Sequence, residues 1–252
     1  MDRSFAARLR GGERLLGTLL SLPSPELAEV AAAAGFDWLW LDMEHGLIGP
    51  TEAQRMVQAA GGSCAPIVRI PELAEIWVKK ALDSGAAGVI VPHVDTAGQA
   101  ALAVRWGKYP PSGGRSVGFT RANMFGQRFE DYLARANAET ALVAQVEHID
   151  GVRNIEAIAA VPGIAAVLIG PFDLSASLNK TGRLDDPEVR AAIDRVRNVC
   201  AVKGMPLGIY ARDVAAARDA LDAGYTFVCV GLDAALYAAA AADIIRVLKS
   251  SP

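Results

Sequence analysis

One phrase occurs four times along this chain: a helix-like run, a glycine, and then an apolar strand-like run. A glycine just past a helix end commonly adopts the left-handed conformation that terminates the helix. The apolar residues that follow each glycine are typical of a strand buried on both faces. The repeat therefore predicts helices that alternate with parallel strands. The four glycines are Gly35, Gly85, Gly163 and Gly224, and the apolar runs stop at Asp42, Pro92, Gly170 and Gly231.

Further apolar runs between the repeats extend this alternation. Eight strands and eight helices in 252 residues predict a single α/β domain, a (β/α)8 TIM barrel over residues 1–252. One helix is expected to begin with Ser24 as its N-cap and Pro25 at its first position. The additional strands are expected at 15–20, 65–71, 141–147 and 206–211, and the other helices at roughly 51–60, 72–84, 96–107, 152–160, 187–203, 213–223 and 234–249.

An open, doubly wound sheet is the alternative fold. No expected strand is followed by G-x-G-x-x-G, the sequence with which such folds bind dinucleotides, so the barrel is favoured. A long Pro- and Gly-rich stretch at 108–127 interrupts the connection between the fourth and fifth strands. A stretch of this length inside a compact domain is usually functional or mobile.

The composition excludes several classes of protein. The formal net charge is −3 and both signs are mixed along the chain, which argues against a nucleic-acid partner. The chain contains no run of about 18 apolar residues, so no membrane span is predicted. The three cysteines form no C-x-x-C pair, and the N-terminus lacks a signal-peptide core, so a reduced, cytoplasmic protein is expected. Small-molecule ligands remain as the expected partners.

Polar residues gather where the expected strands end, which is the face of a TIM barrel that carries the chemistry. Each such residue, taken alone, is explained equally well by contact with solvent, and His93 and His148 are expected to lie at the surface or behind the reacting groups. A buried charge inside an apolar phrase, however, needs a partner or a metal. The strand ends carry Asp42, Glu44, His45, Arg69, His93, Gln145, Glu147, His148 and Asp173.

This set of residues favours one kind of chemistry. Two carboxylates and an amide are oxygen ligands that suit Mg²⁺ or Mn²⁺. Histidine carries protons near neutral pH, and arginine stabilises a developing oxyanion. Together they suit the enolisation of a 2-oxo acid at a metal. A Schiff-base aldolase needs a lysine at a strand end, and none of the six lysines lies at an expected strand end.

Six phrases resemble the HpcH/HpaI-type class II pyruvate aldolases, which include 4-hydroxy-2-oxoheptanedioate and 2-dehydro-3-deoxyglucarate aldolases. The resemblance covers about residues 13–240 and implies a TIM-barrel lyase that reversibly cleaves 4-hydroxy-2-oxo acids to pyruvate and an aldehyde. It implies a metal-stabilised pyruvate enolate, a divalent metal (Mg²⁺, Mn²⁺ or Co²⁺), no organic cofactor, and a place in aromatic or sugar-acid catabolism. The phrases are FDWLWLDMEHG, PIVRIP, KKALDSGAAGVIVPHVDTAGQA, YPPSGGRSVG, QVEHIDGVRNIEAIAAVPGIAAVLIGPFDLSASL and GYTFVCVGLD.

The resemblance also implies roles for single residues. It places metal binding on Glu147 and Asp173, and pyruvate binding on Gln145 and on the backbone of Phe172. Asp173 and Arg69 are also expected to contact the substrate.

The catalytic roles follow from the same resemblance. It makes His45 the acid/base and Arg69 the group that stabilises the enolate. It implies that Asp83 raises the basicity of His45, and that Asp42 lines the same site.

The resemblance further implies a homo-oligomer, a trimer or a hexamer, in which subunits exchange the last helix. Phe172, His93 and His148 depart from the expected pattern, which leaves the aldehyde open. Two other functions stay open at this point. One is a related metal-dependent lyase acting on a phosphoenolpyruvate-like or acyl-CoA substrate, and the other is a non-catalytic metal–carboxylate binding protein.

Overall fold

The computed structural model describes residues 4–62 and 64–249. Its strands form a closed parallel barrel in chain order, in which β8 pairs with β1. The predicted TIM barrel is therefore confirmed, and the open sheet is excluded. The strands are β1 (Leu15–Leu20), β2 (Trp38–Asp42), β3 (Ala65–Arg69), β4 (Gly88–Val91), β5 (Ala141–Val146), β6 (Ala166–Ile169), β7 (Leu207–Ala211) and β8 (Phe227–Leu232).

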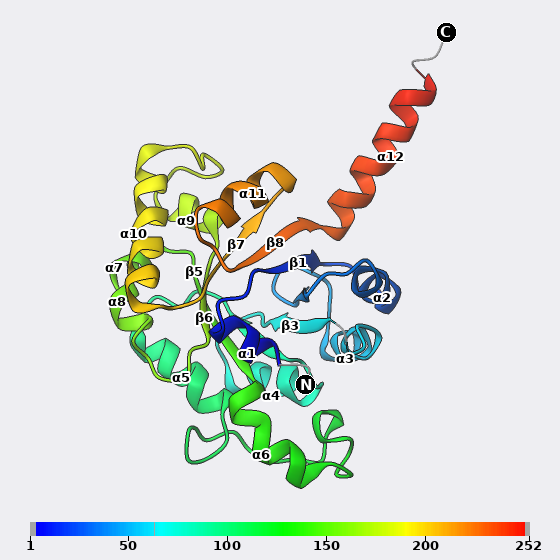
Figure 1. Ribbon diagram of the computed structural model, residues 1–252, viewed down its shortest axis with the longest axis vertical. Helices are drawn as coiled ribbons and strands as arrows, with labels where there is room; N and C mark the ends of the chain where they lie inside the picture. The colour runs from blue at the N-terminus through cyan, green and yellow to red at the C-terminus, as the bar shows by residue number, and fades with distance from the viewer. Residues whose placement is uncertain (1–3, 63, 250–252) are drawn as a thin grey trace.

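Helices follow the strands and cover the outside of the barrel, except for α12, which projects away from it (Figure 1). The expected helix at 152–160 is two short helices that meet at Asn154. The helices are α2 (Pro25–Ala33), α3 (Pro50–Ala59), α4 (Glu75–Asp83), α5 (Ala97–Gly107), α7 (Ile149–Arg153), α8 (Ile155–Ile158), α9 (Pro171–Ser177), α10 (Pro187–Lys203), α11 (Val214–Asp222) and α12 (Asp233–Lys249).

The four repeat glycines all adopt the backbone conformation that the sequence predicted. Their φ angles are 95° at Gly35, 89° at Gly85, 100° at Gly163 and 93° at Gly224. Each one follows a helix and leads into an even-numbered strand, so the same turn is used four times. The predicted cap is present as well, because the Ser24 hydroxyl accepts a hydrogen bond from the Leu27 N–H (3.2 Å).

Besides α9, which directly follows Gly170 after β6, three described elements were not expected from the sequence. The first is α1 (Phe5–Arg10), whose residues Phe5, Ala6 and Leu9 are buried with the residues that begin β1, β2 and β8. It closes the end of the barrel at which the strands begin. The other two lie in or directly after the long stretch at 108–127: the short helix η1 (Arg121–Asn123) and α6 (Phe129–Glu139). In α6 only Ala136 is fully buried, but Phe129, Tyr132 and Leu133 on the same face are half-buried, so the helix carries one narrow apolar stripe.

The alternation of side chains along each strand positions the site. Trp38 and Trp40 of β2 belong to the cluster inside the barrel, whereas Leu39 and Leu41 pack outward against the helices. Because successive side chains point to opposite faces, Asp42 is again on the inner face. Gly17 makes room for this filling, since a Cβ there would overlap the Trp38 ring.

Candidate active site

The inner faces of β2, β3 and β5 each end in buried polar side chains. Asp42, Arg69, Gln145 and Glu147 are all 5% exposed or less. Arg69 follows the inward Ile67, and Gln145 follows the inward Val143. Because every second side chain of a strand points inward, the same inner face that is apolar along the strands becomes polar where they end.

Arg69 lies at the centre of an ion-pair network. Its Nε and Nη2 donate to the two carboxylate oxygens of Asp42 at 2.9 and 2.7 Å, and its Nη1 lies 2.8 Å from Glu44 Oε2. The guanidinium also lies over the Trp40 ring, 4.8 Å from its centroid. Burial acts to lower the pKa of Arg69, but the hydrogen bonds and charge of Asp42 outweigh burial and raise it. Arg69 is therefore a fixed cation at the rim.

Asp42 also shapes the turn that carries His45. Its Oδ1 accepts hydrogen bonds from the backbone N–H groups of Glu44 (3.0 Å) and His45 (3.3 Å). Gly46 lets this turn close, because a Cβ there would overlap the carbonyl oxygen of Asp42. The His45 side chain is 66% exposed, and its Nε2 lies 3.8 Å from Glu44 Oε2. A buried carboxylate thus holds a solvent-accessible imidazole at the cavity.

Glu147 is held on both of its oxygens. Gln145 Nε2 donates to Oε2, and the His93 backbone N–H donates to Oε1 at 2.9 Å. Burial raises the pKa of Glu147 to about 7, although the hydrogen bond from the His93 backbone acts in the opposite direction. A cation beside Glu147 would favour its ionised form. Gly170 is required next to it, because a Cβ there would overlap Glu147 Oε2.

Asp173 and Phe172 lie in the first turn of α9, directly after Gly170 and Pro171. The charge of Asp173 is one of the factors that raise the pKa of Glu147, so the two carboxylates lie near each other. Phe172 is 45% exposed, and its ring centroid is 6.4 Å from that of Tyr210.

These side chains surround a cavity of about 470 Å³. Six of the predicted site residues line it: Asp42, His45, Arg69, Gln145, Phe172 and Asp173. Glu147 joins them through its hydrogen bond with Gln145. The sequence analysis did not predict the apolar wall of this cavity. Its residues lie near the ends of β1, β7 and β8, so a search of the strand ends for apolar as well as polar residues could have found them. These residues are Leu19, Tyr210 and Leu232.

A group of potential metal ligands lies beside this cavity. Glu44, His93 and Glu147 each offer one ligand atom, and these atoms lie within 4.8 Å of one another. Burial raises the pKa of Glu44, and Arg69 opposes this effect. Carboxylate oxygens and an imidazole nitrogen fit a divalent cation. Glu44 and His93, whose roles the sequence left open, therefore join Glu147 as candidate metal ligands.

Asp83 is not brought to the cavity within one chain. It is the last residue of α4, and its Oδ1 accepts a hydrogen bond from Arg115 Nη2 at 2.8 Å. Because α4 runs back to the start of β4, Asp83 lies at the end of the barrel away from the rim. His148 is also apart from the ligand group: its Nδ1 caps α7 by accepting from the Asp150 N–H.

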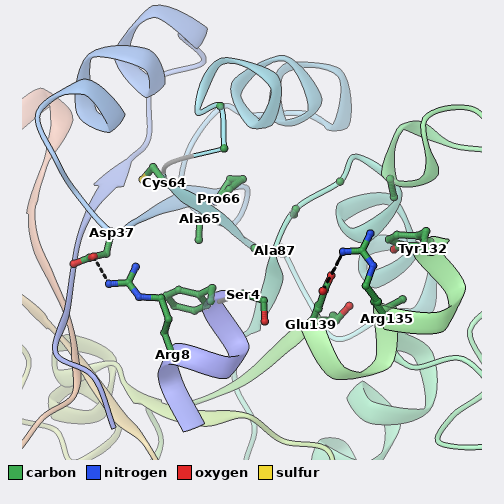
Figure 2. A pocket seen from close by; sticks show the side chains of 18 residues that line it. Ser4, Arg8, Asp37, Cys64, Ala65, Pro66, Ala87, Tyr132, Arg135 and Glu139 are labelled. Carbon is green, nitrogen blue, oxygen red and sulfur yellow. Dashed lines mark hydrogen bonds and ion pairs between the residues drawn. The ribbon is translucent and has the colours of Figure 1, made fainter. Parts of the chain in front are cut away.

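A second cavity, of about 460 Å³, lies at the opposite end of the barrel (Figure 2). Its cations already have acidic partners, since Arg8 contacts Asp37 at 2.6 Å and Arg135 contacts Glu139 at 3.2 Å. Burial raises the pKa of the Cys64 thiol beside it to about 12, which makes this thiol a poor nucleophile. The cavity at the rim is therefore the candidate active site.

The chain resembles known aldolases over nearly its whole length. It is 40% identical to the hydroxypyruvate/pyruvate aldolase of Cupriavidus necator, an alignment that covers 100% of this chain and 94% of the relative. It is 40% identical to the 4-hydroxy-2-oxovalerate aldolase of Novosphingobium aromaticivorans, over 96% of this chain and 93% of the relative. The 5-keto-4-deoxy-D-glucarate aldolase of Klebsiella pneumoniae is 39% identical, over 97% of this chain and 96% of the relative.

Solved structures and the family match agree with these relatives. A family protein from Burkholderia cenocepacia superposes with a TM-score of 0.94 at 40% identity, over 97% of this chain and 98% of the other. Macrophomate synthase superposes with a TM-score of 0.86 at 28% identity, over 98% and 90%. The family described as HpcH/HpaI aldolase/citrate lyase matches residues 16–240. The chain therefore belongs to the HpcH/HpaI aldolase/citrate lyase family, and it is an aldolase.

Proposed function

We propose that this enzyme is a divalent-metal-dependent class II aldolase that reversibly cleaves 4-hydroxy-2-oxo acids to pyruvate and an aldehyde. One observation carries the proposal. A fixed guanidinium and an accessible imidazole share a single cavity with Gln145 and Asp173, and Gln145 links this cavity to the buried Glu147. The names of the three aldolase relatives support it, since one of them names pyruvate.

Glu147 and Asp173 are the proposed metal-binding residues. A divalent cation held there would supply Lewis-acid stabilisation of the negative charge that develops on the substrate. Gln145 and the backbone N–H of Phe172 are proposed to bind the pyruvate half of the substrate. The latter group lies in the first turn of α9, where backbone N–H groups have no partner within the helix.

His45 and Arg69 are proposed to perform the proton transfer and the charge stabilisation. In the cleavage direction His45 takes the proton of the 4-hydroxyl, the C3–C4 bond breaks, and the aldehyde leaves. The electron pair of that bond forms the enolate, whose developing charge faces the Arg69 guanidinium. Return of the proton to C3 gives pyruvate. Asp42 positions both groups, because it binds Arg69 and holds the His45 turn.

Metal removal tests this proposal. Release of pyruvate from a 4-hydroxy-2-oxo acid should stop in EDTA and return when Mn²⁺ or Mg²⁺ is added. Activity that survives EDTA, or covalent trapping of the enzyme by borohydride with pyruvate, would contradict a metal-dependent mechanism. His45→Ala should retain pyruvate binding but lose turnover, which separates an enzyme from a binding protein. A screen of pyruvate against several aldehydes identifies the second substrate.

Asp83 remains a proposed contributor to the basicity of His45. Within one chain it contacts Arg115 and does not line the cavity. Any effect on His45 must therefore come from a neighbouring copy of the chain.

We also propose a homo-oligomer, a trimer or hexamer, in which α12 docks on a neighbouring subunit. This helix extends from the barrel (Figure 1), and residues 234–240 are exposed throughout. Exposed Leu236, Tyr237, Ile245 and Leu248 give it an apolar surface that an isolated helix would leave in water.

A cytoplasmic location, without a nucleic-acid or membrane partner, is part of the proposal. Among the described helices, none is long and apolar enough to cross a membrane.

A further inference from the structure

His93 has a backbone conformation that non-glycine residues rarely adopt. Its φ angle is 51°, in the left-handed region, directly after Pro92 at the end of β4. Strained conformations of this kind persist where the surrounding structure requires them, and they cluster at functional sites. Here the conformation points the backbone N–H at Glu147 Oε1 (2.9 Å) and brings the imidazole between two carboxylates.

Each ring nitrogen of His93 faces a different carboxylate, and with one ligand atom each His93, Glu44 and Glu147 lie within 4.8 Å of one another. Its Nδ1 is 3.5 Å from Glu147 Oε1, and its Nε2 is 3.5 Å from Glu44 Oε1. These separations are too long for good hydrogen bonds. Two ligands that share one cation with bonds of about 2.1 Å lie ~3.0–3.4 Å apart. One cation can bind only one imidazole nitrogen, because the two nitrogens point in different directions. Nδ1 and Glu147 Oε1 are therefore close to the spacing at which they would share a cation, and Glu44 has a ligand atom in the same group.

The surroundings supply a second observation that points to a ligand. Gln145, which is 1% exposed, has no hydrogen-bond partner for its Oε1 among the described residues, although it lines the cavity. Its Nε2 is bound to Glu147. A buried acceptor without a protein donor, at the wall of the cavity and next to the ligand group, is available to a bound ligand.

We propose that His93 is a nitrogen ligand of the divalent cation held by Glu147, and that Glu44 is an oxygen ligand on the same side. This proposal rests on the proposed metal-dependent function. Imidazole nitrogen suits Co²⁺ and Zn²⁺, whereas Mg²⁺ prefers oxygen ligands and retains water. His93 therefore gives this enzyme a preference for Co²⁺ and Zn²⁺ over Mg²⁺.

Titration calorimetry of the full-length protein with Co²⁺ and with Mg²⁺, without substrate, tests the preference. His93→Asn is the informative variant, because Asn tolerates the left-handed conformation and keeps the N–H that binds Glu147. We expect it to weaken Co²⁺ binding by about tenfold or more and Mg²⁺ binding by less than about threefold. His148→Asn is the matched control, since this rim histidine lies outside the ligand group, and it should change neither constant.

Pulsed electron paramagnetic resonance of the Mn²⁺-loaded protein supplies a direct readout. Coupling to a ¹⁴N nucleus should be present in the wild type and lost in His93→Asn. Persistence of the coupling in that variant would make His45 the nitrogen ligand and overturn the inference. Equal weakening of both cations, or no weakening, would overturn it as well. If neither cation binds the wild type, the metal-dependent function itself fails, which is a distinct result.

Discussion

At the scale of single residues, Asp42 serves two purposes with one carboxylate. Its two oxygens bind Arg69, and one of them also accepts the N–H groups that hold the His45 turn. The pair is almost fully buried, with side chains 6% and 3% exposed. A buried bidentate pair of this kind fixes orientation more strongly than a surface pair does.

Asp42→Asn tests this double role. The amide oxygen can still hold the turn, but the amide group cannot neutralise Arg69 or accept on both sides. We expect kcat/KM to fall roughly a hundredfold, because the guanidinium loses its orientation toward the developing charge. Steady-state kinetics measure the fall, and circular dichroism checks that the variant is folded. Asp150→Asn is the control, since Asp150 is an exposed carboxylate beside the same rim; equal activity in both variants would contradict the role.

At the scale of elements, the repeated helix–glycine–strand turn carries a cost that can be measured. The φ angle of Gly35 is 95°, and a Cβ there would meet open space. Any loss of stability on substitution therefore comes from the backbone alone.

Gly35→Ala is expected to lower the free energy of unfolding by about 1–2 kcal/mol, the cost of a left-handed conformation for a residue with a Cβ. Gly62→Ala is the control, because its Cβ also meets open space and no positive φ is present. It should be neutral or stabilise by about 0.4–1 kcal/mol. Urea unfolding measures both, and equal values for the two variants would exclude the backbone explanation.

Lys108 links two helices and makes their stability depend on pH. It follows α5, and its Nζ donates to the carbonyl oxygens of Asn137 (2.6 Å) and Thr140 (2.7 Å) at the end of α6. Burial, and to a lesser extent the charge of Arg10, lowers the pKa of Lys108 from 10.5 to about 8. Between these two values the unfolded chain binds more protons than the folded one, so this group makes unfolding harder as pH rises.

The free energy of unfolding of the wild type relative to Lys108→Met should therefore rise between pH 8 and 10.5, by up to about 3 kcal/mol. Urea unfolding at several pH values measures this difference, which also cancels the titration of other groups. Lys203→Met, at the exposed end of α10, is the control and should run parallel to the wild type. A difference that stays constant or falls over this range would contradict the prediction.

At the scale of the whole molecule, α12 is the element that the barrel does not use. Asp233 anchors its first residue by accepting from the N–H groups of Ser21 (3.0 Å) and Leu22 (2.9 Å). Beyond this anchor the helix is almost entirely exposed. Most helical stability in proteins comes from packing of an apolar face, so packing against another copy would stabilise α12.

A chain that ends at Ala235 keeps the Asp233 anchor and removes the rest of α12. Light scattering should then give a mass near that of one chain, 26.4 kDa before the deletion, whereas the full-length protein should give a trimer or a hexamer. Unchanged circular dichroism per residue would show that the barrel still folds. A monomeric full-length protein, or a truncated chain that keeps its oligomeric mass, would exclude α12 as the docking element.

The sequence alone predicted the barrel and most of the polar residues that line the candidate site. The repeat of Gly35, Gly85, Gly163 and Gly224 predicted the alternation, because a positive φ and a buried strand leave strong local signals. The strand-end rule then brought Asp42, Arg69 and Gln145 to one rim without any knowledge of distances. Helix α1 escaped prediction because it has only six residues, and α6 because it directly follows a Pro- and Gly-rich stretch that indicated a loop.

Only the tertiary structure decided which polar residues meet. It placed Asp83 against Arg115 instead of His45, and it brought the His93 imidazole between Glu44 and Glu147. Sequence spacing predicts the strand on which a side chain lies and the face to which it points. Contacts across a barrel depend instead on the relative register of its strands and on single turns such as the left-handed one at His93. The register and these turns are fixed by the packing of the whole chain, so local periodicity does not predict them.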